Sequence, residues 1–304
     1  MNRRGFLSGL AGAALAPTLG NGVAMAETGM ITRAIPSTGE AMPVVGLGTW
    51  PVFDVGTDEA VRRPLREVVK ALVDAGGRMI DTSPMYGRSE GVVGDIVAGL
   101  GVRDRVFLAT KVWISGRDQG IAQMARSASL MKSPVIDLMQ IHNLVDWKTQ
   151  LATIRDMKAN GKLRCIGITH YTTGSLAELA RILETEKGID FVQLGYSLAT
   201  REAETRLLPV VAQRGVAVIV NQPFERGDLF RSVRGKKLPD WAVEFDCTSW
   251  AQLFLKYLLG DPAITVVIPA TNKADHMQDN LKAGFGRLPD PKQREQIRRF
   301  WDAL

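Results

Sequence analysis

The sequence repeats one pattern eight times: a short run rich in apolar and β-branched residues, followed by a longer run with helical spacing of its apolar residues. Strands that alternate with helices pair in parallel, because each helix carries the chain back to the start of the next strand. Eight such units predict one closed (β/α)8 barrel, which needs about 250 residues. The predicted strands are residues 44–50, 79–83, 106–112, 137–143, 165–170, 191–197, 216–223 and 264–270.

The stretch after the first predicted strand shows the helical pattern. Pro64 is predicted to occupy the first helical position, where its missing N–H is not needed. Gly76 and Gly77 are predicted to end the helix. The apolar residues between them recur at intervals of three and four and form one face: Leu65, Val68, Val69, Leu72 and Val73.

Two segments lie outside the eightfold alternation. Residues 31–35 and 42–44 flank a Ser37-Thr38-Gly39 turn and predict a β-hairpin before the first barrel strand. Residues 289–304 predict an extra C-terminal helix. Because no linker separates these parts, residues 27–304 are predicted to form a single domain.

Residues 1–26 have the features of an export signal. The hexapeptide from Asn2 to Leu7 resembles the twin-arginine export motif, residues 7–15 are apolar, and residues 24–26 form a small-x-small cleavage site. A bilayer-spanning helix needs at least about 18 apolar residues, which no segment provides. The resemblance implies export of a folded protein by the twin-arginine machinery to the periplasm, a route that suits a protein loaded with its cofactor in the cytoplasm.

The charge and the metal-binding residue types exclude several functions. Of the formal net charge of +6, Arg3 and Arg4 contribute two, which leaves +4 after cleavage and no basic cluster for nucleic acid. Cys165 and Cys247 lack metal-ligand spacing; a buried free thiol is expected at Cys165, and a disulfide between the two remains open. The three histidines are too far apart for a zinc motif, so no metal is predicted. No apolar stripe indicates self-association, so a monomer is expected.

Four polar residues are predicted near the carboxyl ends of adjacent strands, where the active sites of such barrels lie. Asp81, Lys111 and His142 end the second, third and fourth strands, and Tyr86 follows Asp81 by five residues. Singly, each has a structural explanation, such as packing, solvation or capping of a turn. As a set on neighbouring strands, they predict one catalytic site.

At these residues the chain resembles the aldo-keto reductase family. The similarity covers residues 31–304 and is carried by an ordered set of segments: 35–50, 80–87, 109–112, 136–143, 166–171, 192–197 and 268–280. The resemblance implies reduction of a small aldehyde or ketone by hydride transfer from a nicotinamide cofactor, with Tyr86 as the proton donor.

The chemistry of carbonyl reduction also requires these residue types. No side chain supplies a hydride, so a cofactor is needed, and the developing alkoxide needs a proton donor. A free tyrosine titrates near about 10, and Lys111 beside Tyr86 is expected to lower that pKa. Asp81 is expected to hold Lys111, and neutral His142 to orient the carbonyl oxygen.

The resemblance also implies the cofactor contacts, with departures from the family pattern. Thr169 and His170 replace a usual Ser-Asn pair beside the nicotinamide carboxamide, and Asn221 stands where the family commonly has a tyrosine. Ala270 and His276 replace the Lys and Arg that hold the adenosine phosphate, and Lys273 lies nearby. NADP(H) is favoured over NAD(H). The full predicted set is Thr49, Thr169, His170, Gln193, Asn221, Pro223, Thr271, His276, Asp279 and Asn280.

Some of these residues have a second interpretation. Thr271, His276 and Asn280 can instead cap the last helix of the barrel. Trp50 and Trp113 end the first and third strands and are predicted to form an apolar wall for the substrate, with a core position as the alternative.

The sequence is also compatible with two other functions. A non-catalytic, cofactor-binding barrel that acts as a partner or sensor in the periplasm would bind the cofactor without turnover. An unrelated barrel enzyme could use Lys111 as a Schiff base. An exported reductase would also need a redox partner, since reduced nicotinamide is not expected to be regenerated freely outside the cytoplasm.

Overall fold

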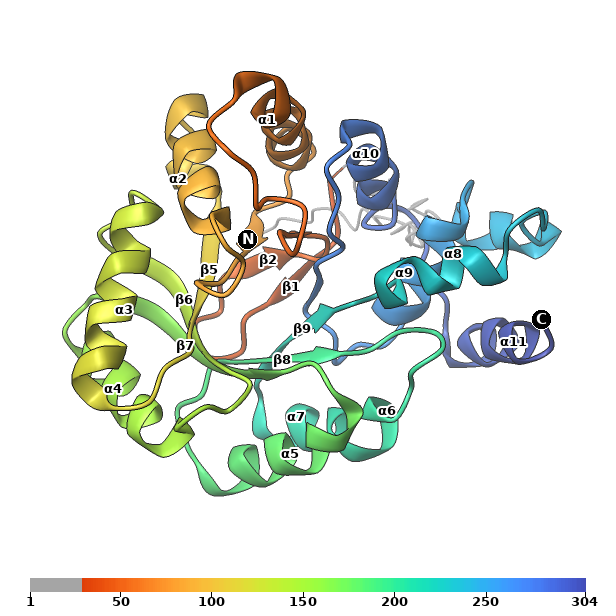
Figure 1. Ribbon diagram of the computed structural model, residues 1–304. Coiled ribbons are helices and arrows are strands. Elements are labelled where there is room, and N and C mark those ends of the chain that lie inside the picture. Colours follow the sequence, from red (N-terminus) through yellow and green to blue (C-terminus); the bar gives the residue numbers. More distant parts are fainter. Residues whose placement is uncertain (1–28) are drawn as a thin grey trace, which may run out of the picture.

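The computed structural model describes residues 29–304 and shows a barrel of eight parallel strands surrounded by helices, with strand order β10-β9-β8-β7-β6-β5-β4-β3 (Figure 1). The first and last strands meet, because Val45 and Gly48 bridge to Val267 and Ala270 in parallel. The predicted (β/α)8 fold is confirmed. The strands are β3 (Leu47–Gly48), β4 (Met79–Asp81), β5 (Phe107–Val112), β6 (Ile136–His142), β7 (Leu163–His170), β8 (Phe191–Gly195), β9 (Ala217–Asn221) and β10 (Val266–Val267).

Helices follow the strands and form the outer ring, with α1 packed against α10 where the barrel closes (Figure 1). The α-helices are α1 (Glu59–Asp74), α2 (Ser89–Leu100), α3 (Arg117–Leu130), α4 (Trp147–Ala159), α5 (Leu176–Thr185), α6 (Ala203–Arg206), α7 (Leu208–Arg214), α8 (Asp228–Ser232), α9 (Trp250–Leu259), α10 (Ala274–Lys282) and α11 (Pro291–Asp302). Short 3-10 helices span Arg103–Arg105, Thr173–Ser175, Glu225–Gly227 and Asp240–Phe245.

The prediction for the start of α1 is wrong. The helix begins at Glu59, where the Asp58 side chain caps it by accepting a hydrogen bond from the Ala60 N–H (2.8 Å). Pro64 therefore lies inside the helix, at the cost of one backbone hydrogen bond. The predicted apolar face and the stop at Gly76 are confirmed, because all five apolar residues are buried and Gly76 has a positive φ of 85°.

The strand predictions are right in position and differ in length at the first and last strands. Only two residues each of 44–50 and 264–270 form strand. Pro269 has no N–H to donate to a ladder, which favours an early end of β10. In the seventh run the strand ends at Asn221, since Gln222 takes a φ of 51° that no strand tolerates.

The predicted hairpin is present as β1 (Thr32–Ala34) and β2 (Ala41–Pro43), and it covers the amino-terminal end of the barrel. Its Ile35 and Met42 are fully buried in one cluster with interior residues such as Phe107 and Phe191. The Arg33 guanidinium donates to the main-chain carbonyl groups of Leu259, Asp261 and Ile264, ahead of β10. The hairpin thus closes one end of the barrel and leaves the other for chemistry.

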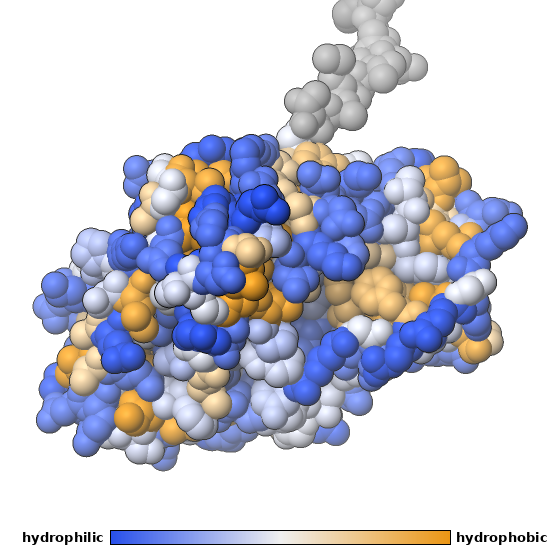
Figure 2. Space-filling view, turned by 45° about the horizontal axis from the view of Figure 1, so that its top comes forward, coloured by the Kyte–Doolittle hydropathy of each residue, from blue (hydrophilic) through white to orange (hydrophobic). Residues whose placement is uncertain are grey.

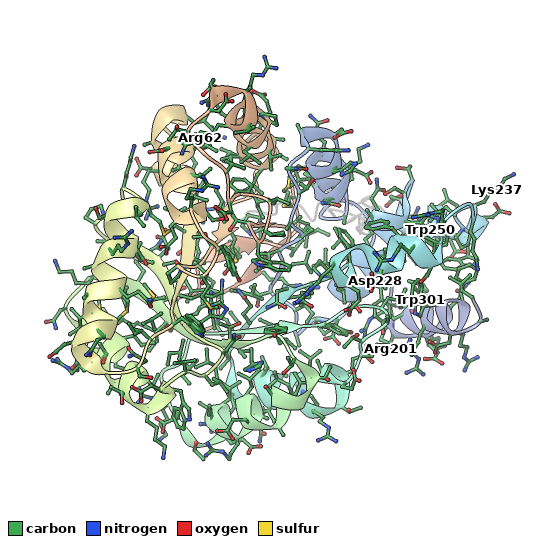
Figure 3. The ribbon with its side chains drawn as sticks, in the orientation of Figure 1. Arg62, Arg201, Asp228, Lys237, Trp250 and Trp301 are labelled. Atoms are coloured by element: carbon green, nitrogen blue, oxygen red, sulfur yellow. The ribbon has the colours of Figure 1, made fainter. Side chains whose placement is uncertain are left out.

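The predicted C-terminal helix is α11. Its N-cap is a complete capping box between Asp290 and Gln293, which explains why the helix starts at Pro291. It packs on α9, since the ring of Phe254 lies 5.7 Å from that of Trp301 in α11 and 5.8 Å from that of Trp250 in α9 (centroid distances). Figure 3 labels the two tryptophans.

Three further predictions concern termini, membranes and thiols. The predicted signal segment, residues 1–26, lies outside the described residues. Within residues 29–304 no helix is long and apolar enough to cross a bilayer. Cys165 and Cys247 are both buried and free, and burial raises the pKa of these thiols to about 12 and about 11, so neither is a ready nucleophile.

Candidate active site

The interior of the barrel changes from apolar to polar toward the carboxyl ends of its strands. Side chains alternate along a strand, so Phe107 faces inward with Lys111 four residues later. On β6, inward-facing Leu138 is followed by Gln140 and His142. The strand pairing places Lys111 opposite Gln140, so the polar positions of neighbouring strands form one layer.

Asp81 and Lys111 form a buried ion pair in this layer. Their exposed fractions are 2% and 0%, and the distance from Lys111 Nζ to Asp81 Oδ2 is 2.6 Å. Lys111 also donates to the Thr82 main-chain oxygen (2.7 Å). Burial acts to lower the pKa of Lys111, but its interactions with Asp81 and Tyr86 together outweigh burial, and the pKa is raised. Lys111 is therefore a fixed cation.

Two amides hold the other oxygen of Asp81. Gln140 Nε2 and Gln193 Nε2 donate to Asp81 Oδ1 at 3.0 and 2.8 Å. Gly167 makes room for this arrangement, since a Cβ there would lie 2.8 Å from the Phe191 main-chain oxygen and 3.2 Å from Gln140 Cγ. A buried carboxylate needs such donors. Sequence reasoning missed Gln140, although its inward position between Leu138 and His142 was a usable signal.

Tyr86 lies on the turn between β4 and α2. Its N–H donates to the Ser83 main-chain oxygen (3.0 Å), and Lys111 Nζ lies 4.9 Å from the centroid of its ring. Burial raises the pKa of the phenol, and the Lys111 charge only partly offsets this effect. Lys111 therefore lowers the pKa of Tyr86 as expected, but burial has the larger effect, and the phenol keeps its proton at neutral pH.

His142 lies beside Tyr86 and is neutral. Burial, with a smaller contribution from the Lys111 charge, lowers its pKa to about 3. The two rings meet edge to face, with centroids 5.9 Å apart and planes at 88°. His142 Nδ1 lies 3.0 Å from Ser83 Oγ. A neutral imidazole carries one N–H and one lone pair, so His142 can give a single hydrogen bond to an oxygen.

A cavity of about 650 Å³ opens above these groups, within the size range of small-molecule sites. Lys111 lies beneath it, while the other three predicted catalytic residues line it. A second cavity of about 630 Å³, beside the hairpin and α7, contains none of them. The predicted site residues that line the first cavity are Asp81, Tyr86, His142, Thr49, Trp50, Thr169, Gln193, Asn221 and Pro223.

The wall of this cavity is partly apolar. On the face shown in Figure 2, hydrophobic residues form separate groups among hydrophilic ones. Among residues 29–304, half of the large hydrophobic side chains that remain exposed line the cavity: Trp50, Met85, Tyr171 and Phe230. The predicted partner of Trp50 is wrong, because Trp113 is 41% exposed and does not line the cavity.

The opposite side of the cavity carries an amide cluster. Gln193 Oε1 accepts from Thr169 Oγ1 (3.3 Å) and Asn221 Nδ2 (3.2 Å). Asn221 Oδ1 is buried and has no partner within the described part of the chain. His170 departs from the prediction, since it does not line the cavity and its Nδ1 accepts from the Thr172 N–H (3.3 Å). It follows an inward-facing residue, so its side chain starts on the opposite face of the strand.

After β10, Ile268 and Ala270 still line the cavity, whereas the predicted cofactor residues around α10 do not. Thr271 Oγ1 accepts from the Lys273 N–H (3.1 Å), as expected of a turn at a helix start, and the side chain of His276 is exposed. Asp279 is used by the protein itself, since its carboxylate accepts from Ser249 Oγ (2.7 Å) and Gln252 Nε2 (2.6 Å). Asn280 is buried. Thr271 thus forms a turn ahead of α10 and does not cap it, since the N-cap is Lys273, and Asp279 is not a free acceptor.

The loop after β9 contributes residues that sequence reasoning missed. Gln222, Glu225 and Arg226 all have positive φ values, near 50°, which L-residues rarely adopt. The Arg226 guanidinium lies 4.7 Å from the centroid of the Trp50 ring, across the mouth of the cavity. No motif marks this contact, because it joins the first and seventh strand-to-helix connections.

In residues 29–304 no group of three or more histidine, cysteine or carboxylate side chains is placed to hold a metal ion. The site combines a neutral acid and a neutral hydrogen-bond donor above a buried cation, and they face a cavity with an amide cluster on its far side.

Known reductases resemble this chain in sequence and in fold. The chain is 27% identical to aldo-keto reductase YhdN of Bacillus subtilis, covering 70% of this chain and 66% of that protein. It is 27% identical to methylglyoxal reductase YeaE of Escherichia coli, covering 79% and 84%. An aldo-keto reductase from Klebsiella pneumoniae, solved with NADPH, superposes with a TM-score of 0.76 at 25% identity, covering 90% of this chain and 96% of that one. A sequence model of the aldo/keto reductase family matches residues 44–302, and the chain therefore belongs to that family.

Proposed function

We propose that this protein is an NADP(H)-dependent reductase that converts a small aldehyde or ketone to an alcohol. The observation that carries the proposal is a protonated Tyr86 and a neutral His142 at the floor of one cavity, directly above the buried Lys111–Asp81 pair. An acid and a neutral donor side by side can bind one carbonyl oxygen from two directions.

The cofactor expected of the family would supply the hydride, which no side chain of the protein can donate. The residues fit a nicotinamide carboxamide. Asn221 Oδ1 is a buried acceptor without a partner in the described residues, and an amide N–H2 of the cofactor would satisfy it. Thr169 and Gln193 line the same part of the cavity. The NADPH bound to the Klebsiella pneumoniae relative supports the phosphorylated form.

The protein's own groups perform the proton chemistry. Tyr86 donates its phenol proton to the oxygen that becomes the alcohol. The phenolate left behind would be costly in a buried site, and the Lys111 cation stabilises it. Asp81 and its two amide donors keep Lys111 in place, so the cation does not need to reorganise during the reaction. His142 holds the carbonyl oxygen by its single N–H.

The cavity favours small carbonyl compounds with apolar or aromatic parts. Trp50, Met85 and Phe230 offer apolar surface, and Tyr171 adds an aromatic ring. The description of YeaE as a methylglyoxal reductase makes methylglyoxal a suitable member of a substrate panel.

The test is turnover by the full-length chain. Loss of reduced-cofactor absorbance is followed with NADPH and NADH against methylglyoxal and aromatic aldehydes, and cofactor binding is titrated in parallel by fluorescence. Turnover with binding of NADPH supports the proposal. Tight cofactor binding with no turnover on any carbonyl would overturn it in favour of a sensor or partner protein. Borohydride trapping of substrate on Lys111 would point to Schiff-base chemistry.

Localisation is a separate proposal that rests on the sequence of residues 1–26. We propose export to the periplasm by the twin-arginine machinery, with a redox partner that supplies electrons there. Cell fractionation tests it: wild type is expected in the periplasmic fraction, and a variant with Arg3→Lys and Arg4→Lys in the cytoplasm. Cytoplasmic wild type would remove both the export and the need for a partner.

A further inference from the structure

Ser83 contacts His142, which lines the cavity, but does not line the cavity itself. It follows β4 and is completely buried. Its hydroxyl oxygen accepts from the Met85 N–H (3.2 Å) and lies 3.0 Å from His142 Nδ1. The proposed reaction gives Ser83 no role, although it is the polar partner of the imidazole that is proposed to hold the substrate.

We propose that Ser83 fixes the tautomer of His142: its hydroxyl donates to Nδ1, so the ring proton sits on Nε2 and is available to the carbonyl oxygen. This inference rests on the proposed reductase function and deepens it. Ser83 is then a positioning residue, and it does not touch the substrate.

The direction of the hydrogen bond follows from counting donors and acceptors. A serine hydroxyl has one proton to donate and can accept two hydrogen bonds. If Nδ1 carried the ring proton, Ser83 Oγ would accept from both Nδ1 and the Met85 N–H. Its own proton would then have no acceptor among residues 29–304, since His142 Nδ1 and the Met85 N–H are its only described partners. A buried donor without a partner is costly, so the hydroxyl proton points to Nδ1.

The surroundings of His142 keep it in the neutral form in which a tautomer matters. Among the charged groups packed around it, Lys111 disfavours a second ring proton, and burial does so more strongly. The Asp81 carboxylate has no hydrogen bond to the ring, because its oxygens are taken by Lys111, Gln140 and Gln193. Among residues 29–304, the side-chain partner of His142 Nδ1 is Ser83 and not a carboxylate, so Ser83 sets the tautomer.

The experiment reads the tautomer directly, without turnover. The full-length chain is labelled with 15N in its histidine rings, and the ring nitrogens are observed by NMR at neutral pH. The chain has three histidines, and loss of signals in His142→Gln assigns those of His142. We expect the wild-type protein to show an unprotonated Nδ1 and a protonated Nε2 at His142. In Ser83→Ala, we expect Nδ1 to lose its hydrogen-bond shift and the second tautomer to appear.

The matched control is Ser89→Ala. Ser89 is equally buried, and its Oγ has no hydrogen-bond partner among the described residues, so its removal should leave the His142 signals unchanged. In turnover, Ser83→Ala is expected to lose about 3- to 10-fold in kcat/KM with unchanged cofactor binding, the effect of one neutral hydrogen bond. Ser89→Ala should stay within about twofold of wild type.

A protonated Nδ1 in wild type, or His142 signals that do not respond to Ser83→Ala, would overturn the inference whatever the turnover. A Ser83-dependent Nε2–H tautomer in a protein that reduces no carbonyl would support the assignment of Ser83 and defeat the proposed function. The two failures are therefore distinguishable.

Discussion

The two sides of the cavity are built differently. On the side of β4–β6, Asp81, Lys111 and His142 are almost fully buried and joined to one another or to neighbours by short contacts. On the side of β7–β10, the residues that depart from the family pattern are less uniform: Thr169, Asn221 and the exposed Ala270 line the cavity, whereas His170 and the exposed His276 do not. A buried charge needs an opposite charge and hydrogen-bond partners, and losing one of them is strongly destabilising. An exposed side chain that contacts a phosphate can be replaced with a small change in free energy.

This contrast explains why the family resemblance is strong at one side and weak at the other. A catalytic proton donor needs a defined environment on every side, so several residues must agree at once. Cofactor phosphate contacts act more independently and in water. Substitutions on the catalytic side should therefore cause large losses of activity or stability, and substitutions on the cofactor side should cause small ones.

The largest effect is expected from Tyr86→Phe. Removing the phenol proton should lower kcat/KM for carbonyl reduction by about 100- to 10,000-fold, the range for loss of a general acid. The measurement is the initial rate of reduced-cofactor oxidation, with fluorescence titration of the cofactor as the control. Retention of a tenth of the wild-type rate with unchanged cofactor affinity would show that another group delivers the proton.

Lys111→Met tests the intolerance of the catalytic side by stability. It leaves Asp81 charged, buried and without its cation, so the free energy of unfolding should fall by about 3–5 kcal/mol. Urea denaturation followed by circular dichroism measures this change. The control is Lys70→Met, which removes one partner of an exposed pair with Asp74 and should leave the midpoint nearly unchanged. Equal effects at the two sites would refute the contrast.

Restoring a cation tests the cofactor side. His276→Arg returns the charge that the family commonly places there and should raise the ratio of kcat/KM with NADPH to that with NADH by about 3- to 10-fold, because charge-assisted phosphate contacts are strong. Gln278→Arg adds the same charge at another exposed position of α10 and serves as the control. If both variants change the ratio equally, the effect is one of general charge and the predicted phosphate site is misplaced.

The smallest effect expected is on the pH profile. His142, with its pKa lowered to about 3, gains a proton only as the pH falls toward that value, and Tyr86, with its pKa raised by burial, loses its proton only above its ordinary range. The kcat/KM for reduction should therefore stay within about twofold between pH 6 and 9. A fall centred near pH 6.5 would mean that His142 titrates as if exposed. His170→Asn tests whether the half-exposed His170 causes such a fall.

Much of the fold followed from pattern alone. The alternation of strand and helix runs gave the barrel, and the position of Asp81, Lys111 and His142 at strand ends gave the floor of the cavity. The error at Pro64 arose because its proline was taken as the start of the helix, whereas the Asp58 side chain caps the helix and starts it five residues earlier. The errors at Trp113 and His170 arose because a strand end does not fix where the next side chain points.

Contacts between different strand-to-helix loops could not be predicted from the sequence. Arg226 reaches Trp50 only because the loops after β3 and β9 meet over the closed barrel. The sequence showed the Lys111 charge that lowers the pKa of Tyr86, but not the burial that outweighs this effect.

By itself the sequence determined the barrel and the identity of the four catalytic candidates, since these depend on periodicity and on residue type. The tertiary structure decided which of these groups are shielded from solvent. It buried Asp81 with Lys111, recruited Gln140 and Gln193 to them, and set Ser83 against His142. The reason is that protonation and hydrogen-bond direction depend on the solvent and partners around an atom, which only the closed barrel supplies.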